Sequence, residues 1–313
     1  MRAALALALP AVLAAGCGGG RPPVRDARVV LDFTPNAAHA GIFGAVRYRT
    51  DRAHGVRLVI REPGASTDSL KLLAGHRVDL AVLDIHDLGL AREKGQEVVG
   101  VGALVQRPLA SVIAGPGVNR PLELEGRRVG VTGLPSDDAV LRAVVQGDGG
   151  SFARVRRTTI GFSAVPTLVA RKVAAATAFW NVEGVTLRAR GVRTHEFRVD
   201  SYGAPTYPEL VFVTTRDVLR RNRDLVRRAL AAIAAGTSAA LRHPSPVVAA
   251  ISHDAQADAS LIRRELVAVR PALTPPIRLN RQALREWAAF DVRFGILRRR
   301  PDVSRAFDFG VSR

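Results

Sequence analysis

Hydrophobic and polar positions repeat with two different periods along the chain, and together they predict an α/β protein. The first strands are expected at 28–33, 56–61, 78–83, 98–104 and 111–114. The helices between them are expected at 37–52, from Ser66 to Gly75, and at 85–94. The run at 78–83 is apolar throughout, as in strands that are buried on both faces of a parallel sheet. This alternation predicts a doubly wound α/β sheet.

A second series of the same kind follows the glycine- and proline-rich segment 115–121. Its strands are expected at 127–132, 155–160, 173–179, 196–199 and 210–215, and its helices at 136–145, 165–172 and 182–189. Only helices are expected after Asp217, at 217–241, 246–253, 260–269 and 281–294. The sequence therefore predicts two doubly wound α/β lobes and a helical C-terminal part.

The chain is expected to cross between the lobes near 109–117 and again near 207–215. These crossings predict a discontinuous first lobe, 28–110 plus 212–313, and a second lobe at 111–211. A ligand cleft is expected between them, at the carboxyl ends of both sheets.

The N-terminus has the pattern of an export signal. Met1 and Arg2 precede an apolar run at 3–15, which is too short to span a bilayer of about 30 Å. Cys17 follows small residues and resembles the lipidated cysteine of bacterial lipoproteins, with 1–17 as the signal and 18–27 as a tether. An ordinary secretory signal with an incidental cysteine is the alternative.

Composition narrows the classes of function. The chain has 46 Lys and Arg against 28 Asp and Glu, a net charge of +18. Only three of these cations are Lys and the Arg are scattered, so a solvated basic surface is expected rather than a nucleic-acid partner. One Cys excludes a disulfide framework and a Cys-rich metal site.

Motifs for catalysis, cofactors and metals are also missing. The segment Gly130–Gly133 lacks the spacing of a nucleotide-binding loop, and Gly161-Phe-Ser163 does not complete a nucleophile elbow. The seven His form no paired metal-ligand motif. The sequence therefore predicts no catalytic residue, no cofactor and no metal site.

Several segments, in matching order from about residue 28 to the 240s, resemble ABC-transporter substrate-binding proteins of the NMT1/THI5-like family. They are 31–39 (LDFTPNAAH), 78–82 (VDLAV), 87–95 (DLGLAREKG), 103–108 (ALVQRP), 124–138 (LEGRRVGVTGLPSDD), 179–184 (FWNVEG) and 202–211 (YGAPTYPELV). The resemblance implies the periplasmic-binding-protein fold. It also implies a thiamine pyrimidine precursor, hydroxymethylpyrimidine or formylaminopyrimidine, as ligand.

Two other functions stay open. The same module could bind another small solute, such as an alkanesulfonate or an aromatic compound. The family also includes fungal enzymes that make the pyrimidine, but those resemble this chain less. They carry a Cys cluster and a Lys where this chain has Leu83-Asp84-Ile85-His86.

An aminopyrimidine needs aromatic faces and hydrogen-bond partners at its rim. The candidate ligand-binding residues are Asp32, Phe33, Asn36, His39, Ser66, Asp84, Ser136, Trp180, Glu183 and Tyr207. Trp180 and Phe33 are expected to stack on the ring and Glu183 to accept from its amine. The structural alternatives are a helix cap for Asn36, Ser66 and Ser136, and a favourable first-turn position for Glu183. Trp287 is expected in the core.

The expected partners are a small pyrimidine, an ABC permease and, through the lipid anchor, a membrane. The protein is expected to act as a monomer at the outer face of the cell membrane or in the periplasm.

Overall fold

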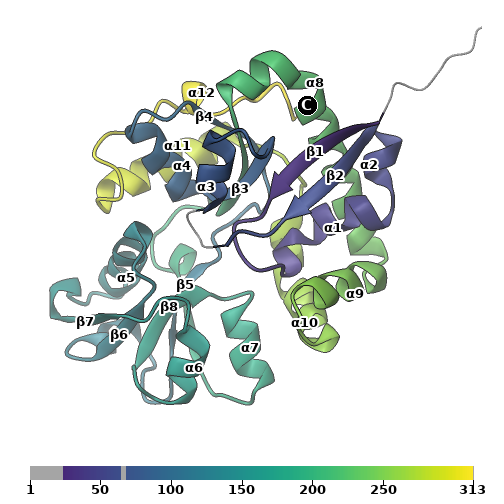
Figure 1. The fold of residues 1–313 in the computed structure, drawn as a ribbon. Helices are drawn as coiled ribbons and strands as arrows, with labels where there is room; N and C mark the ends of the chain where they lie inside the picture. The colour runs from purple at the N-terminus through teal and green to yellow at the C-terminus, as the bar shows by residue number, and fades with distance from the viewer. Residues whose placement is uncertain (1–23, 65–67, 313) are drawn as a thin grey trace, which may run out of the picture.

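The computed structural model describes residues 24–64 and 68–312, which form two five-stranded sheets with helices packed on them (Figure 1). The signal peptide, Cys17 and Ser66 lie outside these residues, so their predicted roles stay predictions.

The first sheet has the strand order β2-β1-β3-β10-β4. Its strands are β1 (Arg25–Val30), β2 (Val56–Arg61), β3 (Leu80–Asp84), β4 (Val98–Ala103) and β10 (Leu210–Thr215). β1 is parallel to β2 and β3, whereas β10 is antiparallel to β3 and β4. The sheet is therefore mixed, with β10 running antiparallel to its neighbours. Strand β3 is buried from Leu80 to Leu83, which explains its continuous apolar run.

The second sheet repeats this arrangement with the order β7-β6-β8-β5-β9. Its strands are β5 (Ala110–Ala114), β6 (Arg128–Val131), β7 (Arg156–Thr159), β8 (Ala175–Phe179) and β9 (His195–Arg198). β6 is parallel to β7 and β8, and β5 is antiparallel to β8 and β9. The chain passes from the first sheet to the second between β4 and β5, and returns between β9 and β10.

Most helices follow the strands as the periodicity predicts. Those of the first part are α1 (Ala40–Arg47), α2 (Thr50–Ala53), α3 (Asp68–Ala74) and α4 (Ile85–Glu93). Those of the second part are α5 (Pro135–Gly147), α6 (Ala164–Val169) and α7 (Glu183–Ala189). The single helix expected at 37–52 is divided, because it begins with a 3-10 turn, η1 (Ala37–His39), and Arg49 adopts a left-handed conformation (φ 57°).

The C-terminal part is helical, as predicted. Its helices are α8 (Arg216–Arg242), α9 (Ser245–Asp254), α10 (Ala259–Val269), α11 (Arg281–Arg293) and α12 (Val303–Ala306). They lie around the first sheet, and α10 also contacts α7 beside the second sheet (Figure 1). Trp287 is fully buried, as expected. None of the helices within 24–64 and 68–312 has the length and apolar character to cross a bilayer.

Candidate functional site: an acidic pocket between the two sheets

The main pocket lies between the two sheets, and residues from both of them line it. Asp32 and Phe33 follow β1, Asp84 ends β3, Thr132 follows β6 and Phe179 ends β8. These parallel strands all point their carboxyl ends at the pocket, as the rule for open α/β sheets predicts. The pocket contains about 970 Å³ of space, part of which is open to solvent.

Carboxyl groups dominate the polar part of the lining. They belong to Asp32, Asp84, Asp87, Asp137, Glu183 and Glu209. No Arg, Lys or His is among the lining residues that the structure describes, although the whole chain carries a net charge of +18. The wall therefore favours a ligand that donates hydrogen bonds or carries positive charge, and it disfavours an anion.

Asp137 uses its carboxylate within the protein. One oxygen accepts from the Thr132 hydroxyl and the Gly133 amide, both at 2.7 Å, and the other accepts from the Thr177 hydroxyl at 2.7 Å. Asp137 therefore holds the loop after β6 in place. Ser136, predicted as a ligand-binding residue, precedes it in the first turn of α5 and lines the pocket.

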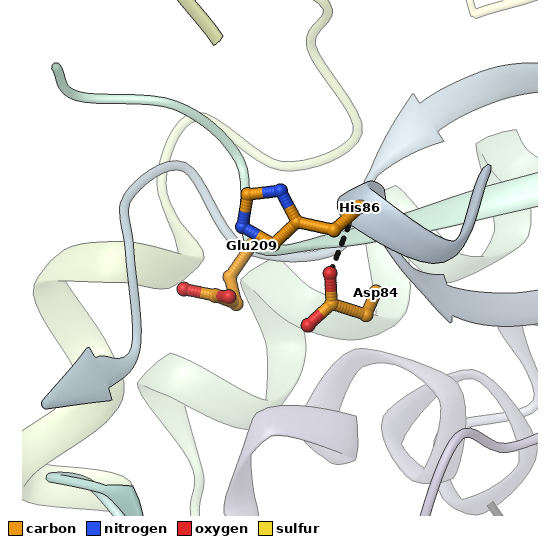
Figure 2. Close-up of side chains that lie close together, drawn as sticks. All are labelled: Asp84, His86 and Glu209. Carbon is orange, nitrogen blue, oxygen red and sulfur yellow. Dashed lines mark hydrogen bonds between the residues drawn. The ribbon is translucent and has the colours of Figure 1, made fainter. Parts of the chain in front are cut away.

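Glu209 connects the two segments that cross between the sheets. Its Oε2 accepts from the backbone amides of Leu109 at 2.7 Å and Ala110 at 3.1 Å. Asp84 lies beside it and caps α4, accepting from the His86 amide at 2.8 Å (Figure 2). Burial raises the pKa of both carboxyl groups, and carboxyls placed so closely resist being ionised together.

His86 supplies positive charge beside this pair. Burial by itself lowers the pKa of His86, but the charges of Asp291 and Asp84 outweigh it and raise the pKa to about 10. The His86 Nδ1 lies 2.7 Å from the Asp291 carboxylate. A charged imidazole therefore offsets the carboxyl groups around it.

Asp84, His86 and Glu209 also form a set of possible metal ligands, because their ligand atoms lie within 4.8 Å of one another (Figure 2). The contacts around them argue against this use. His86 faces Asp291 through Nδ1 and the Tyr207 hydroxyl, at 3.3 Å, through Nε2. One Glu209 oxygen is taken by two backbone amides. The donor set fits an internally balanced charge cluster better than a metal site.

The first loop holds Asp32 at the pocket. His39 is fully buried, and its Nδ1 accepts from the backbone amide of Asn36 at 3.1 Å. The proton therefore lies on Nε2, which donates to the Asp32 carboxylate at 2.8 Å. The Asn36 side chain accepts from the Ala38 amide and caps the 3-10 turn η1, as the structural alternative predicts. His39 therefore positions Asp32 from behind the lining.

The structure does not place Trp180 or Tyr207 in the pocket. Trp180 is 2% exposed and its indole N–H donates to the Pro108 carbonyl at 3.0 Å. Tyr207 is fully buried and contacts His86 edge-to-face. The described aromatic lining consists instead of Phe33, Phe162 and Phe179.

Sequence reasoning missed several lining residues. Phe162, from the loop after β7, contacts Phe33 from the loop after β1, with ring centroids 5.2 Å apart. Its place after a predicted strand was the only signal for it. Asp87, one turn after Asp84 on α4, and Glu209 also line the pocket and were not predicted.

Glu183 takes the position that the sequence predicts. It lies in the first turn of α7, lines the main pocket and accepts from the Phe179 amide at 3.1 Å. Burial raises the pKa of its carboxyl group. Glu183 therefore combines a structural contact with an acceptor at the pocket wall.

A second buried carboxyl group, that of Glu265, should make the stability of the protein depend on pH. Glu265 on α10 is 3% exposed, accepts from the Ala37 amide, and has its pKa raised from 4.5 to about 7, by burial and then by the charge of Glu183. The folded protein therefore binds this proton more tightly than the unfolded chain. Its contribution to stability falls as pH rises from about 4.5 through 7. Relative to wild type, Glu265→Gln should gain about 2–4 kcal/mol of stability at pH 8 and little at pH 4.5.

Urea unfolding of both proteins between pH 4.5 and 8 measures this difference. Glu286→Gln, which changes an exposed carboxylate on α11, is the matched control and should show no such trend. A constant difference between Glu265→Gln and wild type at all pH values would contradict the prediction.

Comparisons with known proteins bear on the family and the fold of this chain. The family model described as NMT1/THI5 like matches residues 36–246. The formylaminopyrimidine-binding protein of Halalkalibacterium halodurans is 29% identical over 201 residues, 63% of this chain and 61% of that protein. The chain thus matches about three fifths of the length of this curated relative.

Two solved structures show the same fold. The alkanesulfonate-binding protein SsuA from Xanthomonas axonopodis pv. citri, bound to MOPS, has a TM-score of 0.72 at 15% identity and covers 92% of this chain and 99% of its own. The periplasmic aliphatic sulphonate binding protein SsuA from Escherichia coli has a TM-score of 0.73 at 14% identity, with 90% and 91% covered. The expected periplasmic-binding-protein fold is confirmed, and identities this low say nothing about the ligand.

Proposed function

Because this chain belongs to the NMT1/THI5-like family, we propose that it is the substrate-binding protein of an ABC importer for a thiamine pyrimidine precursor, hydroxymethylpyrimidine or formylaminopyrimidine. The observation that carries the proposal is the acidic wall of the pocket. Six carboxyl groups and no Arg, Lys or His line its described part. A neutral ring with an exocyclic amine donates hydrogen bonds to such a wall.

The pocket offers the contacts that such a ring needs. Phe33 and Phe162 provide aromatic faces, each worth roughly 1 kcal/mol beyond burial. Glu183 offers a carboxylate to the amine, and a charge-assisted hydrogen bond contributes about 1.5–3 kcal/mol. Asp32 and Asp84 are further acceptors on the opposite sheet.

The same wall weighs against a sulfonate ligand and against pyrimidine synthesis. The structural neighbours are named for sulfonates, but a sulfonate here would face carboxylates with no cation to pair with among the described lining residues. A pyrimidine synthase of the fungal kind would have to bind pyridoxal phosphate, whose phosphate meets the same difficulty. The chain also lacks the Lys and the Cys cluster of those enzymes. Binding without catalysis is therefore the proposed activity.

Delivery follows from the two-sheet arrangement. A ligand that contacts residues of both sheets favours the closed arrangement by its differential affinity. The closed monomer then presents its surface to a membrane permease and releases the ligand there.

Titration calorimetry on the chain without residues 1–17 tests the ligand class. The probes are 4-amino-5-hydroxymethyl-2-methylpyrimidine, the corresponding formylaminopyrimidine, MOPS and pyridoxal phosphate. We expect saturable binding of at least one pyrimidine and none of MOPS or pyridoxal phosphate. Saturable binding of MOPS with no response to either pyrimidine would overturn the proposal.

We propose further that the chain is exported and anchored through lipidated Cys17, the only Cys in the sequence. In a bacterial host, Cys17→Ser should abolish the lipid-sized mass increment and detergent partitioning, because no thiol remains for acylation. A Cys17→Ser protein that still carries that mass increment would contradict the anchor.

A further inference from the structure

A small cavity adjoins the main pocket and contains an unusual amide. We call this cavity the annex. The residues lining it are Asp32, Phe33, Asn36, Ala38, Leu109, Phe179, Asn181, Val182, Glu183 and Leu210. Five of them also line the main pocket, namely Asp32, Phe33, Phe179, Glu183 and Leu210. The two cavities therefore adjoin along these shared residues.

Asn181 is fully buried at the wall of the annex. Its side-chain Nδ2 and Oδ1 both lack a hydrogen-bond partner among the residues that the structure describes. Burying a donor and an acceptor without partners destabilises a protein. The Asn181 side chain thus lowers the stability of the folded protein, whereas an apolar side chain at this position would not.

The other polar side chains of the annex are engaged. The Asp32 carboxylate accepts from His39. The side-chain amide of Asn36 accepts from the backbone amide of Ala38 and donates to the Thr34 carbonyl. Glu183 accepts from the Phe179 amide. Asn181 therefore differs from these neighbours, because its side-chain amide makes no hydrogen bond to the described residues. Buried polar groups without partners are typical of sites where proteins sacrifice stability for function.

We propose that Asn181 is a specificity-determining residue whose amide binds an uncharged edge of the ligand that presents one hydrogen-bond donor and one acceptor side by side. This proposal rests on the proposed function and deepens it. In an aminopyrimidine, the exocyclic amine and the adjacent ring nitrogen form such an edge. A side-chain amide matches that pattern with two parallel hydrogen bonds, as Asn does with the amino edge of adenine.

Asn181 and Glu183 divide the recognition between them. The amide can rotate by half a turn, so by itself it requires a donor–acceptor pair but not a particular order. When ionised, Glu183 only accepts, and it lies at the boundary between the annex and the main pocket. A ligand that has only hydrogen-bond acceptors, such as a sulfonate, can accept from the Asn181 Nδ2 but leaves the Asn181 Oδ1 facing an anion.

The test compares Asn181→Leu, which has similar volume and no polar atom, with wild type in two measurements. Without ligand, Asn181→Leu should unfold at a temperature higher by about 2–6 °C, because the unpartnered amide is gone. With 4-amino-5-hydroxymethyl-2-methylpyrimidine, its affinity should fall roughly ten- to hundredfold. Its preference for this probe over the analogue with hydrogen in place of the amine should shrink.

Asn36→Leu is the matched control, because it removes an amide from the same annex that is already engaged. Asn36→Leu should unfold at a lower temperature than wild type. An unchanged or lower unfolding temperature for Asn181→Leu would overturn the proposal, since the amide would then have a structural role. Unchanged pyrimidine affinity in a stable Asn181→Leu protein would overturn it equally.

The two measurements separate this proposal from the proposed function. If wild type binds none of the pyrimidines, the proposed function fails and the pyrimidine edge at Asn181 fails with it. If wild type binds the pyrimidine and Asn181→Leu binds it equally well, the proposed function stands and only the role of Asn181 is overturned.

Discussion

Glu183→Gln is expected to weaken binding of 4-amino-5-hydroxymethyl-2-methylpyrimidine about ten- to hundredfold while leaving the fold intact. Gln keeps the shape, and its carbonyl oxygen can still accept from the Phe179 amide. Its NH₂ group, however, would present a donor where the ligand's amine needs an acceptor. An unsatisfied buried donor costs about 1–3 kcal/mol, which corresponds to this loss of affinity. Titration calorimetry measures it.

Thermal unfolding provides the control for this variant. Because burial raises the pKa of the Glu183 carboxyl, its ionisation opposes folding, and the Gln variant should unfold at a temperature equal to or above that of wild type. Full pyrimidine affinity in folded Glu183→Gln would assign Glu183 a purely structural role and would leave the acidic wall without its central acceptor.

Trp180→Ala is expected to lower the free energy of unfolding by about 3–5 kcal/mol, as large-to-small substitutions of buried aromatic side chains do. Trp180 is 2% exposed, donates to the Pro108 carbonyl, and lies under the guanidinium of Arg198, 4.1 Å from the ring centre. It packs on the segment where the chain crosses from β4 to β5. Its loss should therefore weaken the packing of this crossing segment. Denaturant unfolding measures the resulting fall in the free energy of unfolding.

Trp180→Phe separates packing from ligand stacking. Phe keeps most of the buried area but loses the hydrogen bond to Pro108 and part of the packing, so it should cost about 1–3 kcal/mol, less than Ala, and leave pyrimidine affinity nearly unchanged. The opposite pattern, in which Trp180→Ala is as stable as wild type and fails to bind pyrimidine, would restore the stacking role predicted from the sequence.

Trp180 and Phe162 show which feature of the site could not be predicted from the sequence, namely which side chain after each strand turns into the pocket. Both follow predicted strands, β8 and β7, and strand ends were correctly predicted to meet the pocket. Which side chain turns inward depends on the loop after each strand. Trp180 turns toward the crossing segment at Pro108, whereas Phe162 turns toward Phe33 from the other sheet.

The division of the first helix has a similar origin. The apolar spacing over 37–52 fits one continuous helix, but Asn36 caps a 3-10 turn and Arg49 is left-handed. Side-chain periodicity reports which face is buried and is insensitive to a local change in backbone winding. Strands β5 and β10 were predicted, but their antiparallel direction was not, since burial on both faces makes an apolar strand read alike in either direction.

The sequence by itself determined the alternation of strands and helices, the helical C-terminal part, the resemblance to the family, and the place of Glu183, Asp32, Phe33, Ser136 and Asp84 at strand or helix ends. These features follow from local spacing, which burial and backbone geometry impose on neighbouring residues. Only the tertiary structure decided that the wall is acidic and that Asn181 has no hydrogen-bond partner among the described residues. Those properties belong to side chains far apart in the sequence, such as Asp84 and Glu209, which meet only because the chain crosses twice between its sheets.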